Sequence, residues 1–207
     1  MKPFYKTVAA EASASMVERK SRFLAAVRPV STEEAALELI AQMRAQYYDA
    51  THNVYAYIIG ENNIMRYSDD GEPSGTAGVP VLEVLRKEGL IDVAVVVTRY
   101  FGGTLLGAGG LVRAYGASAK LGVDAAGIIT RTLCDIVKVN CDYTMFGKVQ
   151  YETLGGGYVI KDTVYEGDVS VFVYTKVAET QDYIKKMCDI TNARALCEVV
   201  GREYLDL

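Results

Sequence analysis

Residues 95–116 read VVVTRYFGGTLLGAGGLVRAYG, and the change of pattern within this stretch decides the fold. The run of β-branched residues, which begins at Val93 and ends at Arg99, is typical of a buried strand. Five glycines then follow within nine positions, at Gly102, Gly103, Gly107, Gly109 and Gly110. A helical pattern starts at Leu111. The stretch therefore predicts a strand, a glycine loop and a helix.

The glycine loop is a candidate anion site. Glycine permits positive φ, and the first N–H groups of a helix lack intrahelical partners, so the loop can present donors to a phosphate or carboxylate. Arg99 ends the strand and Arg113 is expected in the first helical turn, where a cation is unfavourable unless an anion is near. A tight turn with close packing of helix on sheet is the alternative, since the strict nucleotide-binding spacings are absent.

Composition limits the class of protein. Half of the 207 residues are apolar and 23% are charged, which indicates a globular chain. No apolar run approaches the length of a membrane span, and no apolar segment near the N-terminus suggests a secretory signal. The formal net charge is −4 and neither half is basic, so we expect no DNA specificity, although a local basic patch stays possible.

The four cysteines form no C-x-x-C pair, and the chain has one histidine. We therefore expect reduced thiols in a cytoplasmic protein, no metal site, no cofactor and no membrane partner.

The first part of the chain alternates strands and helices. Residues 4–30 predict a hairpin that turns at 18–20, and a helix follows to about Asp49 with Ser31 and Glu34 at capping-box spacing. A second hairpin over residues 53–67 turns at 60–63. A polar loop over residues 68–78 then enters a helix that ends before Gly89.

The order of elements changes after Gly127. We expect strands at 132–142, 158–165, 169–177 and 195–204, with helices at 145–153 and 179–192. This βαββαβ order is ferredoxin-like, with an antiparallel sheet and two helices on one face. We therefore predict an α+β protein with domains at residues 1–130 and 131–207.

Polar residues of the first part suggest chemistry but leave alternatives open. Asp69, Asp70 and Glu72 could hold a hard cation with a substrate phosphate, or could cap the turns and the helix that follow. His52, next to Asn53, is the only imidazole available for an acid–base step, and a structural role is equally compatible with its position.

Hydroxyl and aromatic residues allow two interpretations as well. Ser74 and Thr76 precede a helix and could either bind a phosphate or cap that helix. Tyr100 and Phe101 stand beside Arg99, a combination suited to stacking on a base, whereas packing of one ring into the core is the commoner arrangement.

Four motifs resemble the YigZ and IMPACT family: KSRF at 20–23, HNVYAY at 52–57, SDDGEPSGTAGVP at 68–80 and TRYFGGTLLGAGGLVRAY at 98–115. The resemblance implies a first domain with the fold of the second domain of ribosomal protein S5. The remainder resembles the ferredoxin-like C-terminal domain of the bacterial members, which is similar to the last domain of elongation factor G. Eukaryotic IMPACT proteins regulate translation and have a further N-terminal partner-binding domain that this sequence does not contain, so we do not expect their kinase-pathway role here.

The motif positions define a predicted ligand or anion surface without assigned catalytic residues: His52, Asn53, Asp69, Asp70, Glu72, Ser74, Thr76, Arg99, Tyr100, Gly102, Gly103, Gly109, Gly110 and Arg113. We expect a translation-associated regulator that binds RNA or the ribosome through this surface and the exposed sheet of the second domain. An enzyme acting on a phosphorylated or nucleotide-like small molecule, and a module that sequesters a translation factor, are the alternatives.

Overall fold

The computed structural model describes residues 2–60 and 63–206. The chain divides into an N-terminal unit, residues 5–130, and a C-terminal unit, residues 131–206 together with residues 2–4. Helices and antiparallel sheets make up both units, which confirms the predicted α+β class. The turn expected at residues 60–63 lies partly outside the described residues.

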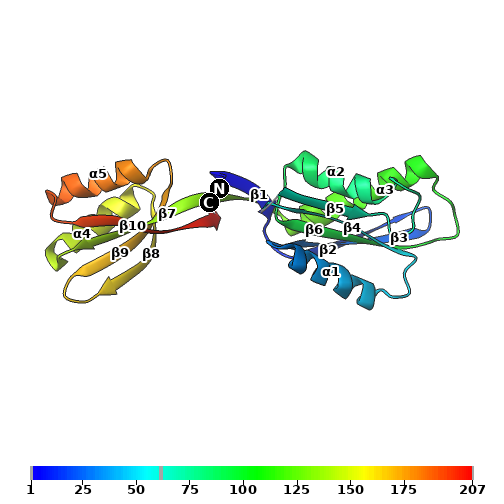
Figure 1. Ribbon diagram of the computed structural model, residues 1–207, viewed down its shortest axis with the longest axis horizontal. Coiled ribbons are helices and arrows are strands. Elements are labelled where there is room, and N and C mark those ends of the chain that lie inside the picture. The colour runs from blue at the N-terminus through cyan, green and yellow to red at the C-terminus, as the bar shows by residue number, and fades with distance from the viewer. Residues whose placement is uncertain (1, 61–62, 207) are drawn as a thin grey trace. The chain divides into compact units, whose positions relative to one another are not determined.

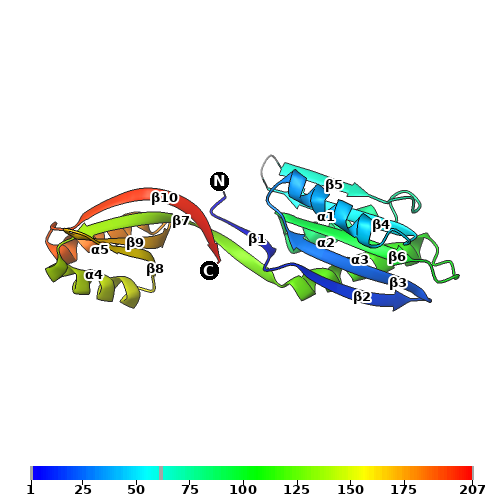
Figure 2. The same cartoon turned by 90° about the horizontal axis from the view of Figure 1, so that it is seen from below.

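The N-terminal unit is built on a five-stranded sheet in the order β2-β3-β6-β4-β5, and Figure 2 shows these strands side by side. Their bounds are Ala12–Glu18 for β2, Ser21–Pro29 for β3, His52–Ile59 for β4, Ile64–Ser68 for β5 and Val93–Tyr100 for β6. Every side chain from Val93 to Arg99 is buried, because β6 is central and helices cover both faces of the sheet.

One helix covers one face of this sheet and two cover the other (Figure 1). α1, Glu33–Gln46, packs on the face that contains Ala26 and Val96. α2, Gly78–Glu88, and α3, Ala108–Ala126, pack on the face that contains Phe23 and Val97. Strand β1, Phe4–Val8, precedes the sheet, and its Lys6 forms a bridge to Leu90 after α2.

Two predicted helix starts are wrong. Thr32, not Ser31, caps α1, because its hydroxyl accepts a hydrogen bond from the backbone N–H of Ala35 at 3.2 Å. α3 begins at Ala108 rather than Leu111, since Gly107, at φ 70°, turns the chain into the helix three residues earlier. Arg113 therefore lies in the second turn of α3, where the helix-dipole argument no longer applies.

The C-terminal unit has the predicted ferredoxin-like order of elements. Its antiparallel strands run β8-β9-β7-β10 across the sheet. The strands are β7 Ile128–Cys141, β8 Val159–Tyr165, β9 Val169–Lys176 and β10 Leu196–Asp206, and the helices are α4 Tyr143–Gly155 and α5 Thr180–Thr191. α4 and α5 share one core with alternate residues of the strands, such as Val137 and Val171. Among the described helices, none is long and apolar enough to cross a membrane.

Candidate functional site

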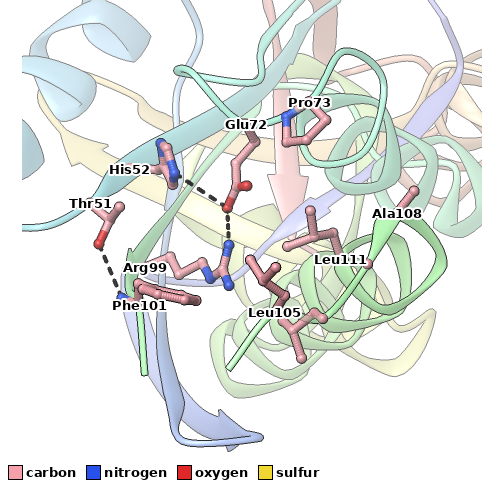
Figure 3. A pocket seen from close by; sticks show the side chains of 11 residues that line it. Thr51, His52, Glu72, Pro73, Arg99, Phe101, Leu105, Ala108 and Leu111 are labelled. Atoms are coloured by element: carbon pink, nitrogen blue, oxygen red, sulfur yellow. Dashed lines mark hydrogen bonds and ion pairs between the residues drawn. The ribbon is translucent and has the colours of Figure 1, made fainter. Parts of the chain in front are cut away.

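A pocket of about 360 Å³ opens in the N-terminal unit between the end of β6 and the start of α3 (Figure 3). Its walls are mainly apolar, and they are formed by Pro73, Phe101, Leu105, Leu106 and Leu111. His52, Glu72 and Arg99 line it as well, so three ionisable side chains meet an otherwise apolar cavity. Such a cavity with a few convergent polar groups is the usual form of a ligand site.

Strand register brings two of these side chains together. His52 on β4 and Phe23 on β3 lie directly opposite Arg99 on β6, so the three side chains form one row on the face of the sheet that α3 covers. The guanidinium of Arg99 lies 5.5 Å from the ring centre of Phe23 and 5.5 Å from that of Phe101. Two aromatic faces therefore hold the cation in place.

Glu72 reaches the same row from the loop before α2. One oxygen of its carboxylate, Oε1, accepts hydrogen bonds from Arg99 Nη1 at 2.5 Å and from the Tyr115 hydroxyl at 2.8 Å. Arg99 is 5% exposed and Glu72 is 8% exposed, so this is a buried ion pair. Burial raises the pKa of Tyr115, and the hydrogen bond to Glu72 raises it further, so the hydroxyl stays protonated and donates.

His52 is fixed in one tautomer. Its Nδ1 lies 2.8 Å from the carbonyl oxygen of Asp70, and because a carbonyl only accepts, Nδ1 carries the hydrogen. In the neutral ring, Nε2 therefore has a lone pair, and this atom lies 3.7 Å from Glu72 Oε1. In Figure 3, dashed lines join His52 to Glu72 and Glu72 to Arg99.

The three carboxylates of the predicted acidic loop have separate partners. Asp69 accepts hydrogen bonds from the backbone N–H groups of Gly75, Ala77 and Gly78 at 2.8 to 3.0 Å. Asp70 accepts from the backbone N–H of Asn53 at 2.6 Å and from Arg44 at 2.7 Å. The contacts of Asp69 match the capping alternative, whereas those of Asp70 are to earlier elements. Within residues 2–60 and 63–206 no group of three or more His, Cys, Asp or Glu is placed to hold a metal ion.

Asp69 thus caps α2, a role also considered for Ser74 and Thr76. α2 has no cap from the side chain of its own N-cap residue, Ala77. The Thr76 hydroxyl instead donates to the carbonyl oxygen of Pro73 at 2.6 Å, and Ser74 is exposed. The Asp69 carboxylate, which precedes α2 by nine residues, therefore holds the loop before this helix in place.

The glycines serve two purposes. A Cβ on Gly102 would lie 2.0 Å from the carbonyl carbon of Lys20, so this glycine lets the end of β6 pack against the β2–β3 turn. Gly103 has a φ of +80°. Gly109 and Gly110 lie in the first turn of α3, where a Cβ on Gly110 would come within 3.0 Å of Leu106. Close packing therefore explains much of the glycine pattern.

The start of α3 nevertheless faces the pocket. Gly107 and Ala108 line the cavity, and α3 has no side-chain cap. The first backbone N–H groups of a helix have no intrahelical acceptor, and they favour a negative group. Donors to an anion are thus a prediction for the helix end rather than for the whole glycine loop.

Of the predicted residues, only His52, Glu72 and Arg99 line the pocket, and the others lie outside it. Tyr100 belongs to the opposite face of β6 from Arg99, and its hydroxyl donates to Asp49 at 2.8 Å. The side-chain oxygen of Asn53 accepts from the Thr98 hydroxyl at 2.7 Å. Arg113 is exposed and lines a separate hollow that shares Leu106 with the pocket.

Sequence reasoning missed several residues of the site. Tyr115 has the spacing of a core residue on α3, but a buried tyrosine hydroxyl normally needs a partner, and this rule could have indicated its bond to Glu72. Ser21 accepts hydrogen bonds from Arg99 Nη2 and from the N–H of Gly102, both at 3.2 Å. Leu105, on an aperiodic loop, gave no signal.

Comparison with known proteins identifies the relatives. A family model described as the Impact N-terminal domain matches residues 19–123, and one described as a domain of unknown function (DUF1949) matches residues 139–194. IMPACT family member YvyE of Bacillus subtilis (strain 168) is 44% identical over 203 residues, which cover 98% of this chain and 94% of that protein. IMPACT family member YigZ of Escherichia coli (strain K12) is 32% identical over 179 residues, or 84% of this chain and 86% of that protein.

Eukaryotic relatives match a shorter part. Protein IMPACT of Rattus norvegicus is 33% identical over 98 residues, which cover 45% of this chain and 31% of that protein. A solved structure described as "Crystal structure of an hypothetical protein" aligns with a TM-score of 0.62 and 27% identity, and covers 97% of this chain and 99% of that one. Because the Impact N-terminal domain matches half of the chain and the bacterial relatives are similar over most of it, the chain belongs to the IMPACT family, as its four motifs predicted.

Proposed function

We propose that this protein is a cytoplasmic, translation-associated regulator that binds RNA, free or within the ribosome, through the pocket end of its N-terminal unit. The observation that carries the proposal is a group of four exposed cations beside the pocket. We call this group the cationic patch, and it consists of Arg19, Lys20, Arg22 and Arg113. Membership of the IMPACT family supports the link to translation, which is the role that the sequence motifs imply.

The cations of the patch gather at the end of the sheet that carries the β2–β3 turn, and Arg22 points to the face opposite to the pocket, as Tyr100 does. Arg19 and Lys20 form the β2–β3 turn, and Arg22 follows on β3 opposite Tyr100. Arg19 and Arg113 line one hollow together with Glu18. This hollow shares Leu106 with the pocket, so the patch adjoins the site.

The patch is short of counterions. In the part of the chain that the structure describes, none of its four members forms an ion pair with a carboxylate within 4.0 Å, whereas Arg28, Arg44 and Lys120 of the same unit all do. Cations without a carboxylate partner are free to neutralise phosphates and to release counterions from a nucleic acid.

The turn that carries two of these cations is conformationally unfavourable. Arg19 has a φ of 44° and Lys20 a φ of 68°, and the two form a two-residue hairpin loop between Glu18 and Ser21. Such loops favour Asn-Gly, because side chains with a Cβ are strained at positive φ. Strain of this kind is characteristic of functional sites. Asn and Gly at these two positions would make the turn more stable. That Arg19 and Lys20 stand there instead supports a binding role.

Aromatic and apolar groups complete the surface. Phe101 is 45% exposed at the mouth of the pocket and offers a face for stacking of an unpaired base. Arg99, by contrast, is buried and already paired with Glu72, so we assign it to the architecture of the pocket rather than to phosphate binding.

The open sheet of the C-terminal unit contributes less than the sequence suggested. Lys138 and Lys161 lie on the face that α4 and α5 leave open, but each is paired with a glutamate, Glu198 at 3.5 Å and Glu203 at 2.7 Å respectively. We therefore place the main contact with RNA on the N-terminal unit.

The test replaces the turn residues by the pair that the backbone prefers. Arg19→Asn with Lys20→Gly should raise the free energy of unfolding by about 1 kcal/mol or more, because the strain at positive φ is relieved. The same variant should bind single-stranded RNA more weakly, and the slope of log K against log salt should fall by about two units, measured by fluorescence anisotropy.

Lys87→Gln supplies the matched control, because Lys87 is exposed in the last turn of α2 and forms no ion pair among the described side chains. Its RNA affinity and salt slope should equal those of the wild type. Ribosome co-sedimentation with the same three proteins extends the test, and a pelleted fraction that resists ribonuclease would indicate a translation factor as the partner. Wild-type affinity no greater than that of a neutral protein at low salt contradicts the proposal.

The second candidate is an enzyme that acts on a phosphorylated or nucleotide-like small molecule. It is favoured by His52 Nε2, which lies beside the Glu72 carboxylate in an apolar pocket at a helix N-terminus, a combination of base and anion site. A thermal-shift screen of phosphorylated metabolites, followed by product analysis by mass spectrometry, tests it. Turnover that His52→Gln abolishes would support this candidate, and binding without turnover would oppose it.

A further inference from the structure

We infer that the pocket receives one unstacked guanine of the bound RNA and recognises it through the adjacent N–H donors of its base-pairing edge. This inference rests on the proposed function and specifies what the same site recognises. Three features of the pocket support it: the acceptors at its base, the apolar walls, and the helix end at its rim.

The base of the pocket presents acceptors. In the neutral His52 ring, Nε2 has the lone pair because Nδ1–H donates to the Asp70 carbonyl, and this side chain is 18% exposed. Glu72 is a carboxylate whose Oε1 is 3.7 Å from that nitrogen. Among the described residues, Arg99 and Tyr115 both donate to Oε1 and none donates to the other oxygen, whereas a carboxylate has about four acceptor positions on two oxygens. A ligand that places hydrogen-bond donors here satisfies both groups.

The pattern of acceptors selects among the bases. Guanine has two adjacent donors, N1–H and the N2 amino group, on its base-pairing edge. Adenine presents an acceptor, N1, beside its single amino group, and uracil has one N–H between two carbonyl oxygens. A carboxylate next to an imidazole lone pair would face at least one acceptor of adenine or uracil, which is repulsive. Guanine alone presents two adjacent donors with no acceptor between them.

The side chain of Glu72 is held in place by its surroundings. The Arg99 guanidinium supplies the counter-charge at 2.5 Å, and the Tyr115 hydroxyl donates a second hydrogen bond. Arg99 is itself fixed by Ser21 and by the rings of Phe23 and Phe101. The carboxylate is therefore preorganised to accept, so ligand binding needs little rearrangement.

The walls suit a flat ring. Phe101, Leu105 and Leu111 line the cavity, and Leu105 is 81% exposed, so the loop presents apolar surface to water that an inserted base would cover. Insertion would compensate for the loss of stacking in the RNA, since stacking on an aromatic side chain supplies a comparable free energy.

The rim of the pocket offers a position for the phosphate of the inserted nucleotide. Gly107 and Ala108 at the uncapped start of α3 line the same cavity, so a nucleotide whose base is inserted can direct its phosphate toward these N–H groups. The cationic patch adjoins the pocket at Leu106 and can hold the neighbouring phosphates of the strand.

The experiment compares guanine with the same base lacking one donor. Five-nucleotide single-stranded RNAs, identical except for a central G, inosine, A or U, are titrated against the full chain at low salt with anisotropy detection. Inosine lacks the N2 amino group, so the G oligonucleotide should bind about 10-fold to 100-fold more tightly than the inosine one. The A and U oligonucleotides should bind no better than inosine.

Variants separate recognition from general binding. His52→Phe should remove the preference for G over inosine while the salt slope remains that of the wild type. Phe101→Leu should weaken binding of all four oligonucleotides about tenfold without changing their order. Circular dichroism melting curves of both variants identify any loss of folding, and 5′-GMP against 5′-IMP repeats the comparison without the neighbouring phosphates.

The outcomes distinguish this inference from the proposed function. Salt-sensitive RNA binding with equal affinity for G and inosine would overturn the guanine site and leave RNA binding in place. Preference for GMP over IMP without any RNA binding would support the guanine pocket and overturn the proposed function. No binding of oligonucleotides or mononucleotides would overturn both.

Discussion

At the scale of single residues, the Glu72 carboxylate joins the most separate parts of the site. It comes from the loop before α2, accepts from Arg99 of β6 and from Tyr115 of α3, and lies beside His52 of β4. Each of these elements places a polar side chain in an apolar interior, and the Glu72 carboxylate lies within contact of all three side chains. Removing its charge should therefore affect the stability of the whole N-terminal unit.

Glu72→Gln tests this prediction. The substitution keeps the size of the side chain but leaves the buried guanidinium of Arg99 without a counter-charge, so the free energy of unfolding should fall by about 3 kcal/mol. Urea denaturation measures the loss. The double variant Glu72→Gln with Arg99→Met should recover part of it, because no uncompensated charge is then buried. A loss below about 1 kcal/mol in the single variant would show that the pair is solvated rather than buried.

At the scale of elements, the end of β6 and the β2–β3 turn are fitted together by one glycine. Gly102 lies so close to the backbone of Lys20 that even a methyl group would overlap with it at 2.0 Å, and backbone atoms cannot rotate away as a side chain can. The same contact positions Phe101 at the pocket mouth and the turn cations at its side. The loop is therefore expected to tolerate no side chain at this position.

Gly102→Ala should separate the turn from the end of β6 and destabilise the protein by about 2 kcal/mol or more, as overpacking of a close contact does. Gly116→Ala is the matched control, since a Cβ there meets nothing within 4 Å and alanine favours the helix by about 1 kcal/mol. Thermal unfolding followed by circular dichroism should thus show opposite shifts for the two variants. A similar shift for both would mean that the loop can move away from Lys20 without loss.

The same elements show what the sequence could and could not predict. The buried run of β6, the Gly89 stop of α2 and the βαββαβ order followed from periodicity and turn chemistry, which are local properties. The partners of Arg99 and Gly102 did not, because each depends on segments far apart in the chain that only the fold brings together. The capping role of Asp69 is local, and the sequence had offered it as an alternative. Arg99 was predicted to face an anion, and its counter-charge instead comes from Glu72, a member of the predicted acidic loop.

At the scale of the whole molecule, each unit has its own core and its own buried charge. The C-terminal unit contains Asp135 of β7, which accepts from Arg202 of β10 at 2.6 Å and from the Thr180 hydroxyl of α5 at 2.8 Å. The Asp135 carboxylate thus connects β7 to β10 and to α5 within the C-terminal unit, as the Glu72 carboxylate connects elements of the N-terminal unit. The response of the C-terminal unit to acid should therefore depend on Asp135.

Burial acts to raise the pKa of Asp135, but hydrogen bonds from Arg202 and Thr180 outweigh it and hold the pKa below its usual value. A carboxyl whose pKa is lowered by folding adds stability above its unfolded pKa of about 4, and this contribution disappears as the pH falls through the lower, folded pKa. Arg202→Met should therefore reduce the free energy of unfolding at pH 7, but only modestly, because the arginine is half exposed and its charge is screened by solvent. The deficit relative to the wild type should shrink as the pH is lowered below about 4, and urea denaturation at a series of pH values measures it.

Lys185→Met, an exposed cation of α5 without an ion pair among the described residues, should leave the pH dependence unchanged. A deficit that stays constant down to pH 2 would show that Arg202 stabilises β10 by packing of its alkyl chain, and that the charge of Asp135 has no part in it.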